Sequence, residues 1–376
     1  MPAKTIALSI NASWNIYNFR AGLIRALQAA GHEVVAISPP DRWAERLAEL
    51  GVRHVAVPMD SAGVSPRKDI ALFLRYRRAL RRLKPDVFLS YTAKPNVWGS
   101  LAAQSLGIPT IANVSGLGTA FIREGLLTRI VTTLYKAAFR RSATIFFQND
   151  EDRDLFVGRR IVDGRKAVLL PGSGIDLDRF APQPRSSPGD APFAFLMVAR
   201  LLWDKGVREY VEAARLVRAD HPETRFRLLG FLDVANRTAV PRSEVEAWAA
   251  EGLIDYLGDA EDVRPHLAAA DCVVLPSYRE GLPRVLLEAA AMGRPLIATD
   301  VPGCRHVTRD GVNGFLCAVR DPVSLARAML RMLSLDPAGR GALGAAARAG
   351  VEADYDERIV ARLYLDAIER ASAPRS

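Results

Sequence analysis

Short apolar runs alternate with helix-length amphipathic stretches along the whole chain. Several of the runs are continuously apolar, which is typical of strands buried on both faces of a parallel sheet. The alternation predicts an α/β protein made of right-handed βαβ units, with helices over such ranges as Phe19–Gly31, Val207–Ala219 and Pro322–Leu333. The predicted strands are Thr5–Ile10, Glu33–Ile37, Asp86–Tyr91, Thr110–Val114, Thr144–Phe147, Phe193–Val198, Arg225–Leu229, Asp271–Leu275, Pro295–Ala298 and Gly314–Cys317.

A segment rich in Pro, Ser and Gly, residues 181–192, divides the chain, and a new strand pattern starts directly after it. We therefore expect two doubly wound, Rossmann-like domains with a cleft between them, residues 1–180 and residues 193–355. Residues 356–376 are expected to form a C-terminal helix that packs back on the first domain. Ligands of such sheets bind outside the carboxyl ends of the strands, so the residues that follow each strand are the candidates for a site.

Composition narrows the class of protein. Of the 376 residues, 49% are hydrophobic and 25% charged, as in an ordinary globular protein. The apolar runs are far shorter than the roughly 18–20 residues of a membrane-spanning helix, and Met1–Ser9 lacks the features of a signal peptide. The three cysteines, Cys272, Cys304 and Cys317, show no CxxC spacing, which argues against a disulfide scaffold or a structural zinc site. These features predict a cytoplasmic protein.

The positive charge lies in the first half of the chain. Lys and Arg outnumber Asp and Glu by 26 to 15 in residues 1–180, whereas the counts are 25 and 27 in residues 181–376. Two basic amphipathic stretches, Arg67–Lys84 and Phe121–Phe139, account for much of the excess and predict contact with an anionic membrane surface. The simpler interpretation is that each is a domain helix with its cations in water. Nucleic acid is not expected, because the basic stretches lack an RRM, KH or helix-turn-helix signature.

The segment from Leu275 to Glu288 carries the strongest candidate chemistry. A buried strand ends at Leu275, a polar loop follows, and Pro283 opens a helix whose free backbone N–H groups can hold an anion. Glu280 precedes the helix, and Glu288 lies about 7–8 Å along it. The two carboxylates are therefore suited to holding hydroxyls at two ends of an extended ligand. The alternative is that both are solvated carboxylates favoured by the helix dipole.

A second candidate segment follows the strand Phe193–Val198. Arg200 and Lys205 stand there beside a helix start, where the Arg fork and the Lys point charge suit a diphosphate, or are merely surface cations. A nicotinamide or flavin site is not expected, because no glycine run completes GxGxxG. Asp176 and Asp178 form a DxD that favours a turn-capping role over metal binding. We therefore expect neither a metal nor a cofactor.

These motifs resemble glycosyltransferase family 4, whose members are retaining enzymes of the GT-B fold. The resemblance rests on Ala199–Gly206, on Pro276–Glu288 with its paired glutamates, and on the segments Asp300–Gly303 and Asp310–Phe315. It implies that Arg200 and Lys205 neutralise the donor diphosphate without a metal ion. It also implies that Glu280 holds the transferred sugar, helped by the backbone amides of Gly281 and Leu282.

The same resemblance implies a nucleoside-diphosphate leaving group, with UDP as the usual carrier. Glu288 would hold the ribose hydroxyls, and the loop after Gly258 would border the base. Retention by front-face attack, in which the leaving phosphate takes the acceptor proton, needs no dedicated base.

The first half resembles family members that act on polyprenyl-diphosphate-linked sugars, through Asn18–Arg20, Tyr91–Pro95, Asn113–Gly118 and Pro171–Asp176. Lys94 is the candidate for the acceptor phosphates, and Asn18, Arg20 and Ser115 are the other expected acceptor contacts. Two departures stand out. The loop expected after the first strand, Asn11–Arg20, lacks the Gly-Gly pair of many members, and Ser115 stands where many have a histidine.

Our hypothesis is a retaining transferase that moves a hexose or N-acetylhexosamine from a UDP-sugar to a polyprenyl-diphosphate-linked acceptor in surface polysaccharide or glycan assembly. It would act in the cytoplasm, bound peripherally to the inner face of the cell membrane. A UDP-sugar 2-epimerase of the same fold and a non-catalytic sugar-nucleotide or lipid-binding module are the alternatives.

Overall fold

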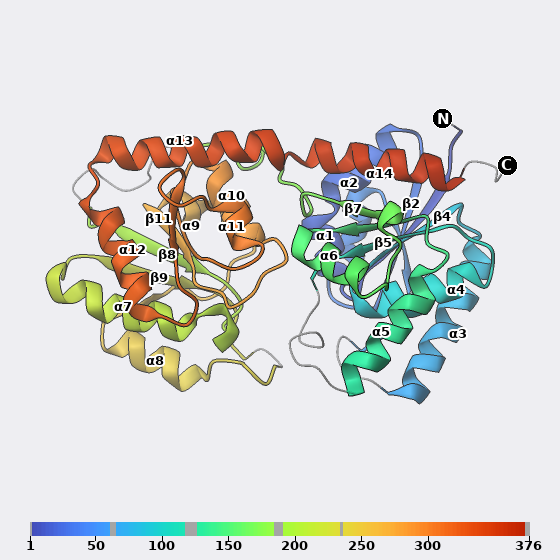
Figure 1. Ribbon diagram of the computed structural model, residues 1–376, viewed down its shortest axis with the longest axis horizontal. Coiled ribbons are helices and arrows are strands. Elements are labelled where there is room, and N and C mark those ends of the chain that lie inside the picture. Colours follow the sequence, from blue (N-terminus) through green and yellow to red (C-terminus); the bar gives the residue numbers. More distant parts are fainter. Residues whose placement is uncertain (1, 61–64, 117–125, 184–190, 234–235, 373–376) are drawn as a thin grey trace. The chain divides into compact units, whose positions relative to one another are not determined.

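The computed structural model describes residues 2–60, 65–116, 126–183, 191–233 and 236–372. The chain forms two compact units (Figure 1), here called the first domain, Met1–Gly174 with Glu357–Ser376, and the second domain, Ile175–Asp356. Most of the expected linker, residues 184–190, lies outside the described residues, as do residues 117–125 with the start of the second basic stretch. Among the described residues, no helix combines the length and apolar character needed to cross a membrane.

The first domain is built on a parallel sheet with the strand order β3-β2-β1-β4-β5-β6-β7. Its strands are β1 (Thr5–Ser9), β2 (Glu33–Ser38), β3 (Arg53–Ala56), β4 (Val87–Tyr91), β5 (Thr110–Val114), β6 (Thr144–Phe147) and β7 (Ala167–Leu169). Its helices are α1 (Ser13–Phe19), α2 (Ala21–Ala29), α3 (Pro66–Leu83), α4 (Ser100–Gln104), α5 (Leu126–Phe139), α6 (Asp150–Gly158) and α14 (Glu357–Ser372), with helical turns at Glu45–Leu50, Pro95–Gly99 and Gly164–Lys166.

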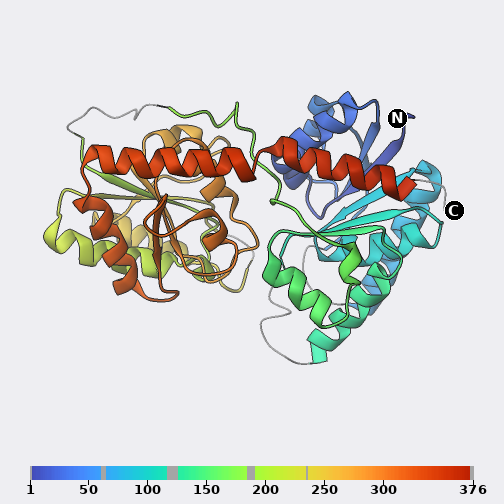
Figure 2. The same cartoon turned by 45° about the horizontal axis from the view of Figure 1, so that its top comes forward.

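Helices cover both faces of this sheet because successive strand residues point in opposite directions. Along β1, Ile6 and Leu8 pack into one core, while Ala7 packs into another core with Tyr76 of α3. The first of these cores is completed by the C-terminal helix α14, which packs against α2 (Figure 2) and buries Tyr364 among the strands.

The second domain has a parallel sheet with the order β10-β9-β8-β11-β12-β13. Its strands are β8 (Ala194–Val198), β9 (Arg225–Leu229), β10 (Asp255–Tyr256), β11 (Cys272–Leu275), β12 (Leu296–Thr299) and β13 (Gly314–Cys317). Its helices are α7 (Val207–Asp220), α8 (Arg242–Ala250), α9 (Arg264–Ala268), α10 (Arg284–Ala291), α11 (Cys304–Val307), α12 (Pro322–Ser334) and α13 (Pro337–Asp354), with a helical turn at Trp203–Lys205.

Both faces of this second sheet are also covered. One core contains Phe195 and Met197 of β8 with the side chains of α7 and α12, which lie side by side (Figure 1). The opposite core contains Leu196 of β8 with the side chains of α10 and α13. Continuous burial of β8 and β11 explains why these strands read as unbroken apolar runs.

In each sheet the chain adds strands outward on one side of its first strand and then returns to add strands on the other side. The reversal falls between β1 and β4 in the first sheet and between β8 and β11 in the second. The loops that leave adjacent strands at such a switch point separate and leave room for a ligand. These two places therefore position the candidate site residues.

One sequence expectation was wrong at the first of these places. Asn11–Arg20 was interpreted as a loop, but Ser13–Phe19 forms the helix α1. The Ser13 backbone N–H donates to an Asp41 carboxylate oxygen at 2.8 Å, and the Ile16 side chain is fully buried. A tertiary contact and one buried side chain thus fix a helix too short to show in the hydrophobic pattern.

Candidate functional site

Lys205 and Glu280 meet at the switch point of the second sheet. Lys205 ends the turn after β8, and Glu280 lies in the loop after β11. The Lys205 Nζ is 2.5 Å from the Glu280 Oε1, and the side chains are only 18% and 14% exposed. The Ser277 hydroxyl donates to the same carboxylate oxygen at 2.7 Å. Two donors on one oxygen hold the carboxylate in a fixed orientation and leave its Oε2 for other contacts.

The loops after β8 and β11 are held against each other by backbone contacts. The Tyr278 N–H donates to the Asp204 carbonyl oxygen at 2.9 Å. Gly206 has φ of +77°, and a Cβ there would lie 2.1 Å from the Pro276 carbonyl oxygen. Only glycine fits this close approach, which places Lys205 within reach of Glu280.

Helix α10 begins beside this ion pair. Pro283 is its N-cap residue, and Gly281 and Leu282 directly precede it. Gly303, in the loop after β12, approaches so closely that a Cβ there would lie 2.5 Å from the Gly281 carbonyl oxygen. The start of α10, with eight helical residues, thus stands at the same edge as Lys205 and Glu280.

Glu288, one turn into α10, pairs with Arg284 through an Nε–Oε1 contact of 2.8 Å. Burial raises the pKa of the Glu288 carboxyl, and the adjacent Arg284 guanidinium opposes this rise. Sequence reasoning singled out Glu288 but missed Arg284, although the i,i+4 spacing on a helix was a usable signal.

Arg200 and Gly258 stand at the same edge, after β8 and β10. The Arg200 side chain is exposed. Gly258 has φ of +75°, and its carbonyl oxygen accepts from the Gly230 N–H at 2.8 Å, which joins the loop after β10 to the loop after β9. The second domain therefore gathers all seven of its predicted site residues along one edge of its sheet.

Sequence reasoning also missed a partly buried contact of the loop after β11. The Tyr278 hydroxyl donates to Glu209 Oε1 of α7 at 2.8 Å, and the Arg320 guanidinium lies 4.6 Å from the Tyr278 ring centroid. Burial and the Glu209 carboxylate raise the pKa of Tyr278 to about 12, so its hydroxyl stays a donor at neutral pH. No short sequence motif marks this contact, because its partners lie 69 positions apart.

The predicted residues of the first domain follow β1, β4 and β5. Arg20 is 6% exposed, and its guanidinium carbon lies 4.3 Å from the Tyr91 ring centroid. Asn18 donates its amide to the Trp14 carbonyl oxygen within α1. The Ser115 hydroxyl donates to Asn113 Oδ1 at 3.1 Å.

Lys94 pairs with a buried acid. Its Nζ lies 3.4 Å from Asp69 Oδ1 of α3, with side-chain exposures of 15% and 7%. The Asp69 backbone N–H donates to the Ser65 carbonyl oxygen, within the first turn of α3. The pair ties the loop after β4 to the start of α3.

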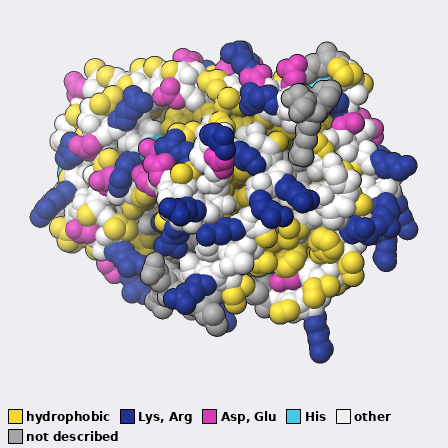
Figure 3. All heavy atoms as spheres, turned by 45° about the vertical axis from the view of Figure 1, so that its right-hand side comes forward, with side chains coloured by type: hydrophobic (Ala, Val, Ile, Leu, Met, Phe, Trp, Pro, Cys, Tyr) yellow, Lys and Arg dark blue, Asp and Glu magenta, His cyan; other side chains and the backbone are white. Residues whose placement is uncertain are grey.

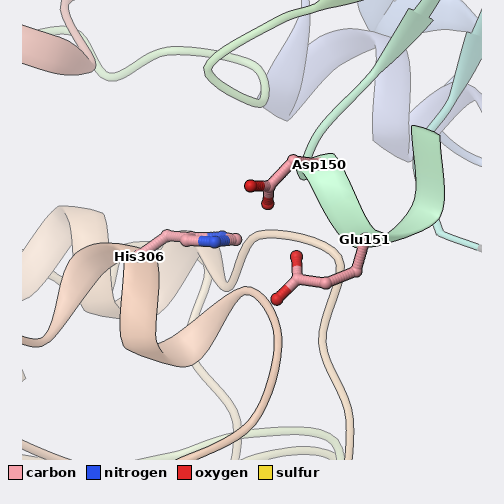
Figure 4. A group of neighbouring side chains, drawn as sticks. All are labelled: Asp150, Glu151 and His306. Carbon is pink, nitrogen blue, oxygen red and sulfur yellow. The ribbon is translucent and has the colours of Figure 1, made fainter. Parts of the chain in front are cut away.

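Two groups of side chains have residue types that can bind a metal ion: Asp176 with Asp178, and Asp150 with Glu151 and His306. Asp176 Oδ1 accepts from the Arg179 N–H at 2.9 Å, a turn-capping contact. Figure 4 shows Asp150 and Glu151 in the first turn of α6, where negative charge is favourable, and His306 on α11. The carboxylates and this histidine belong to different domains, and we assign none of the three a role in binding metal.

Family models match both domains. The "Glycosyl transferase 4-like domain" matches residues 18–172, and "Glycosyl transferases group 1" matches residues 192–335. The first range contains the predicted acceptor residues, and the second contains Arg200, Lys205 and both glutamates.

Curated relatives cover most of the chain. The N,N'-diacetylbacillosaminyl-diphospho-undecaprenol alpha-1,3-N-acetylgalactosaminyltransferase of Campylobacter jejuni is 28% identical over 375 residues, which covers 96% of this chain and 97% of the relative. The UDP-Gal:alpha-D-GlcNAc-diphosphoundecaprenol alpha-1,3-galactosyltransferase of Escherichia coli is 27% identical and covers 75% of each chain.

Solved structures share the fold. Anabaena Alr3699/HepE, determined in complex with UDP and glucose, superposes with a TM-score of 0.80 at 17% identity, covering 97% of this chain and 99% of that one. At this identity the likeness concerns the fold alone, the two Rossmann-like domains of the GT-B architecture. With both family models and the curated transferases in agreement, the chain belongs to the family 4 glycosyltransferases and is a glycosyltransferase of the GT-B fold.

Proposed function

We propose that the protein transfers a hexose or N-acetylhexosamine, with retention, from a UDP-sugar to a sugar linked to polyprenyl diphosphate. The observation that carries the donor half is the single sheet edge that presents Arg200, Lys205, Glu280 and Glu288. The acceptor half is supported by the Campylobacter and Escherichia coli relatives, whose names specify diphospho-undecaprenol-linked acceptors. The name of the Escherichia coli relative also specifies a UDP-linked galactose, which supports a uridine carrier.

The donor diphosphate would take its positive partners from the second domain. An ammonium has three N–H donors, so Lys205 can donate one to Glu280 and keep two for phosphate oxygens. The exposed Arg200 offers a planar fork that suits two oxygens at once. With the backbone amides before α10, these groups stabilise the charge that develops on the leaving diphosphate.

The sugar and ribose would be held by the two carboxylates. Glu280, oriented by Ser277 and Lys205, accepts from hydroxyls of the transferred sugar. Glu288, oriented by Arg284, accepts from the ribose hydroxyls, and the loop after Gly258 borders the base. As the bond from the anomeric carbon to the phosphate oxygen breaks, the acceptor oxygen bonds to the same face of the carbon. Its proton passes to the departing phosphate, so the reaction balances without a separate base.

The first domain would bind the acceptor through Lys94, Asn18, Arg20 and Ser115. Peripheral membrane association follows from the same proposal, since the acceptor carries a lipid. Helix α3 is suited to that contact: Ile70 and Leu74 are 58% and 54% exposed among its many cations. Lys and Arg side chains also gather along the right-hand edge of the surface in Figure 3.

The test is incubation of the full chain with a panel of UDP-sugars and undecaprenyl-diphosphate-linked sugars in buffer containing EDTA. We expect a lipid-linked product with one donor and an α-configured new bond. Absence of product with every donor would refute the transferase, and epimer formation without acceptor would favour the epimerase. Loss of activity only in EDTA would refute the metal-free mechanism.

The matched variants are Arg200→Ala and Arg215→Ala. Removing one group that stabilises charge in a transition state typically costs about 10²–10³ in kcat, which we expect for Arg200→Ala. Arg215 lies on α7 in a surface ion pair with Glu251, and such pairs contribute little to stability. Equal rates of the two variants would remove Arg200 from the site.

A further inference from the structure

A cavity of about 500 Å³ lies at the carboxyl edge of the first sheet. Of its lining residues, only Lys94 has a role in the function proposed above. Its walls come from the segments after β2, β3 and β4 and from the first two turns of α3. These elements are all in the first domain, beside its switch point. The lining residues include Pro58, Met59, Arg67, Lys68, Arg75 and Lys94, with Pro39 and Pro40 beside them.

The cavity has a cationic side. Arg67, Lys68 and Arg75 lie along one face of α3, and Lys94 faces them from the loop after β4. Part of this charge is compensated: Lys68 pairs with Asp60 at 3.0 Å, and Lys94 with the buried Asp69 at 3.4 Å. Four cations against two acids leave an excess of two positive charges, which suits a diphosphate that is esterified at both ends, as in a lipid-linked sugar.

The lining residues from the segments after β2 and β3 are mainly apolar. Three prolines and Met59 offer few polar groups, and the Arg75 guanidinium donates to the Pro58 carbonyl oxygen at 2.9 Å, which satisfies one of the polar groups of this wall. The Met59 sulfur rests against the Tyr76 hydroxyl at 3.7 Å. On the helix surface, the exposed Ile70 and Leu74 continue the apolar character next to the cationic face.

We propose that this cavity, lined by Arg67, Lys68, Arg75 and Lys94, binds a diphosphate that carries a prenyl chain. The phosphates contact the cations, and the first isoprene units lie against Pro58 and Met59. A free diphosphate would contact only the cations, and a prenyl alcohol would contact only the apolar lining residues. The inference rests on the proposed function for the identity of the ligand as the acceptor's lipid anchor, but the cavity itself stands on the geometry of the first domain.

The experiment measures binding of farnesyl diphosphate to the full chain by titration calorimetry, beside inorganic diphosphate, farnesol and UDP. We expect farnesyl diphosphate to bind at least tenfold more tightly than inorganic diphosphate or farnesol. Arg67→Gln with Lys68→Gln should weaken it about tenfold or more, because two charge-assisted contacts are lost. Both side chains are exposed, so the fold should tolerate the change; unchanged thermal unfolding and UDP affinity would show this.

The matched control is Arg140→Gln with Arg141→Gln, an adjacent exposed pair that lines a different cavity of the same domain. It should leave the affinity for farnesyl diphosphate unchanged. Equal losses in both double variants would reduce the effect to general electrostatics and overturn the site. Equal affinities for farnesyl and inorganic diphosphate would overturn the prenyl part.

The turnover assay separates this inference from the proposed function. If lipid-linked sugar is a substrate and its KM does not change in the Arg67/Lys68 double variant, the proposed binding role of the cavity is refuted. The proposed function is then supported. If farnesyl diphosphate binds here but no lipid-linked sugar is turned over, the proposed function is refuted. The proposed binding role of the cavity is then supported.

Discussion

The surroundings of the Glu288 carboxyl disfavour its charged form. Burial raises the pKa of its carboxyl even though the Arg284 guanidinium lies 2.8 Å away. The folded chain therefore holds this proton more tightly than the unfolded chain does. By linkage, ionised Glu288 lowers stability above its folded pKa, and the penalty disappears below the ordinary value of 4.5. Such a perturbed carboxylate at a sheet edge is typical of a functional group.

Glu288→Gln should therefore separate stability from activity. We expect a melting temperature equal to or above that of the wild type at pH 7, with the difference vanishing as the pH falls toward 4. The KM for the donor should rise about tenfold, because a charged acceptor of hydroxyl hydrogen bonds is lost. Thermal unfolding across pH and donor titrations measure both effects.

The control is Glu352→Gln. Glu352 has the same i,i+4 spacing to its partner, Arg348, but is 51% exposed. It should change neither the donor KM nor the pH dependence of unfolding. A clear drop in melting temperature for Glu288→Gln at pH 7 would contradict the buried-charge argument.

At this scale the sequence singled out candidate residues better than it predicted their partners. Arg200, Lys205, Glu280 and Glu288 are candidates because each follows a buried strand or lies on the helix after it. The contact of Lys205 with Glu280 could not be derived, because the residues are 75 positions apart and meet only where two backbones touch. Asp69, the partner of Lys94, is likewise invisible to any local motif.

At the scale of elements, the loops after β8 and β11 bring the proposed donor residues Lys205 and Glu280 together. Their separation is set by Gly206, whose missing side chain admits the Pro276 carbonyl oxygen. The geometry of the Lys205–Glu280 contact thus depends on a residue that touches neither of them through a side chain. The loops are also joined through the Tyr278 N–H and the Asp204 carbonyl oxygen.

Gly206→Ala should push these loops apart. The new Cβ would meet the Pro276 oxygen at 2.1 Å, so one loop must move, and we expect kcat to fall at least tenfold. Gly252→Ala is the control, since Gly252 also has positive φ, +66°, but nothing lies within 4 Å of its Cβ position. Both variants carry the backbone penalty of about 1–3 kcal/mol. Equal activity of the two would show that the close approach does not matter.

Elements with strong periodicity were predictable, and short ones were not. The ten predicted strands all exist, with small shifts at their ends. The edge strands β3, β7 and β10 escaped prediction because they have two to four residues that are only partly buried, and so lack an apolar run. Helix α1 escaped for the related reason that its contacts come from β2 and the loop after it.

At the scale of the whole molecule, the net charge of +9 predicts that the protein binds anionic membrane surfaces. In flotation assays we expect binding to phosphatidylglycerol vesicles and weak binding to phosphatidylcholine vesicles. Binding should decline with salt, because the Debye length shrinks from about 10 Å at 0.1 M to about 3 Å at 1 M. Equal binding to both lipids would contradict an electrostatic contact.

Because helix α14 lies at the C-terminal end of the described chain, it affects the order in which the two domains fold during synthesis. Val360, Tyr364 and Ile368 supply fully buried side chains to the core of the first domain, and the Tyr364 hydroxyl accepts from the Asn113 amide at 2.9 Å. A growing chain exposes the strands of that domain first but lacks this part of its core until residues 357–372 emerge. The second domain, Ile175–Asp356, lies in the sequence between the two segments of the first domain, so it can finish folding earlier. During synthesis, the part of the protein that begins first is therefore completed last.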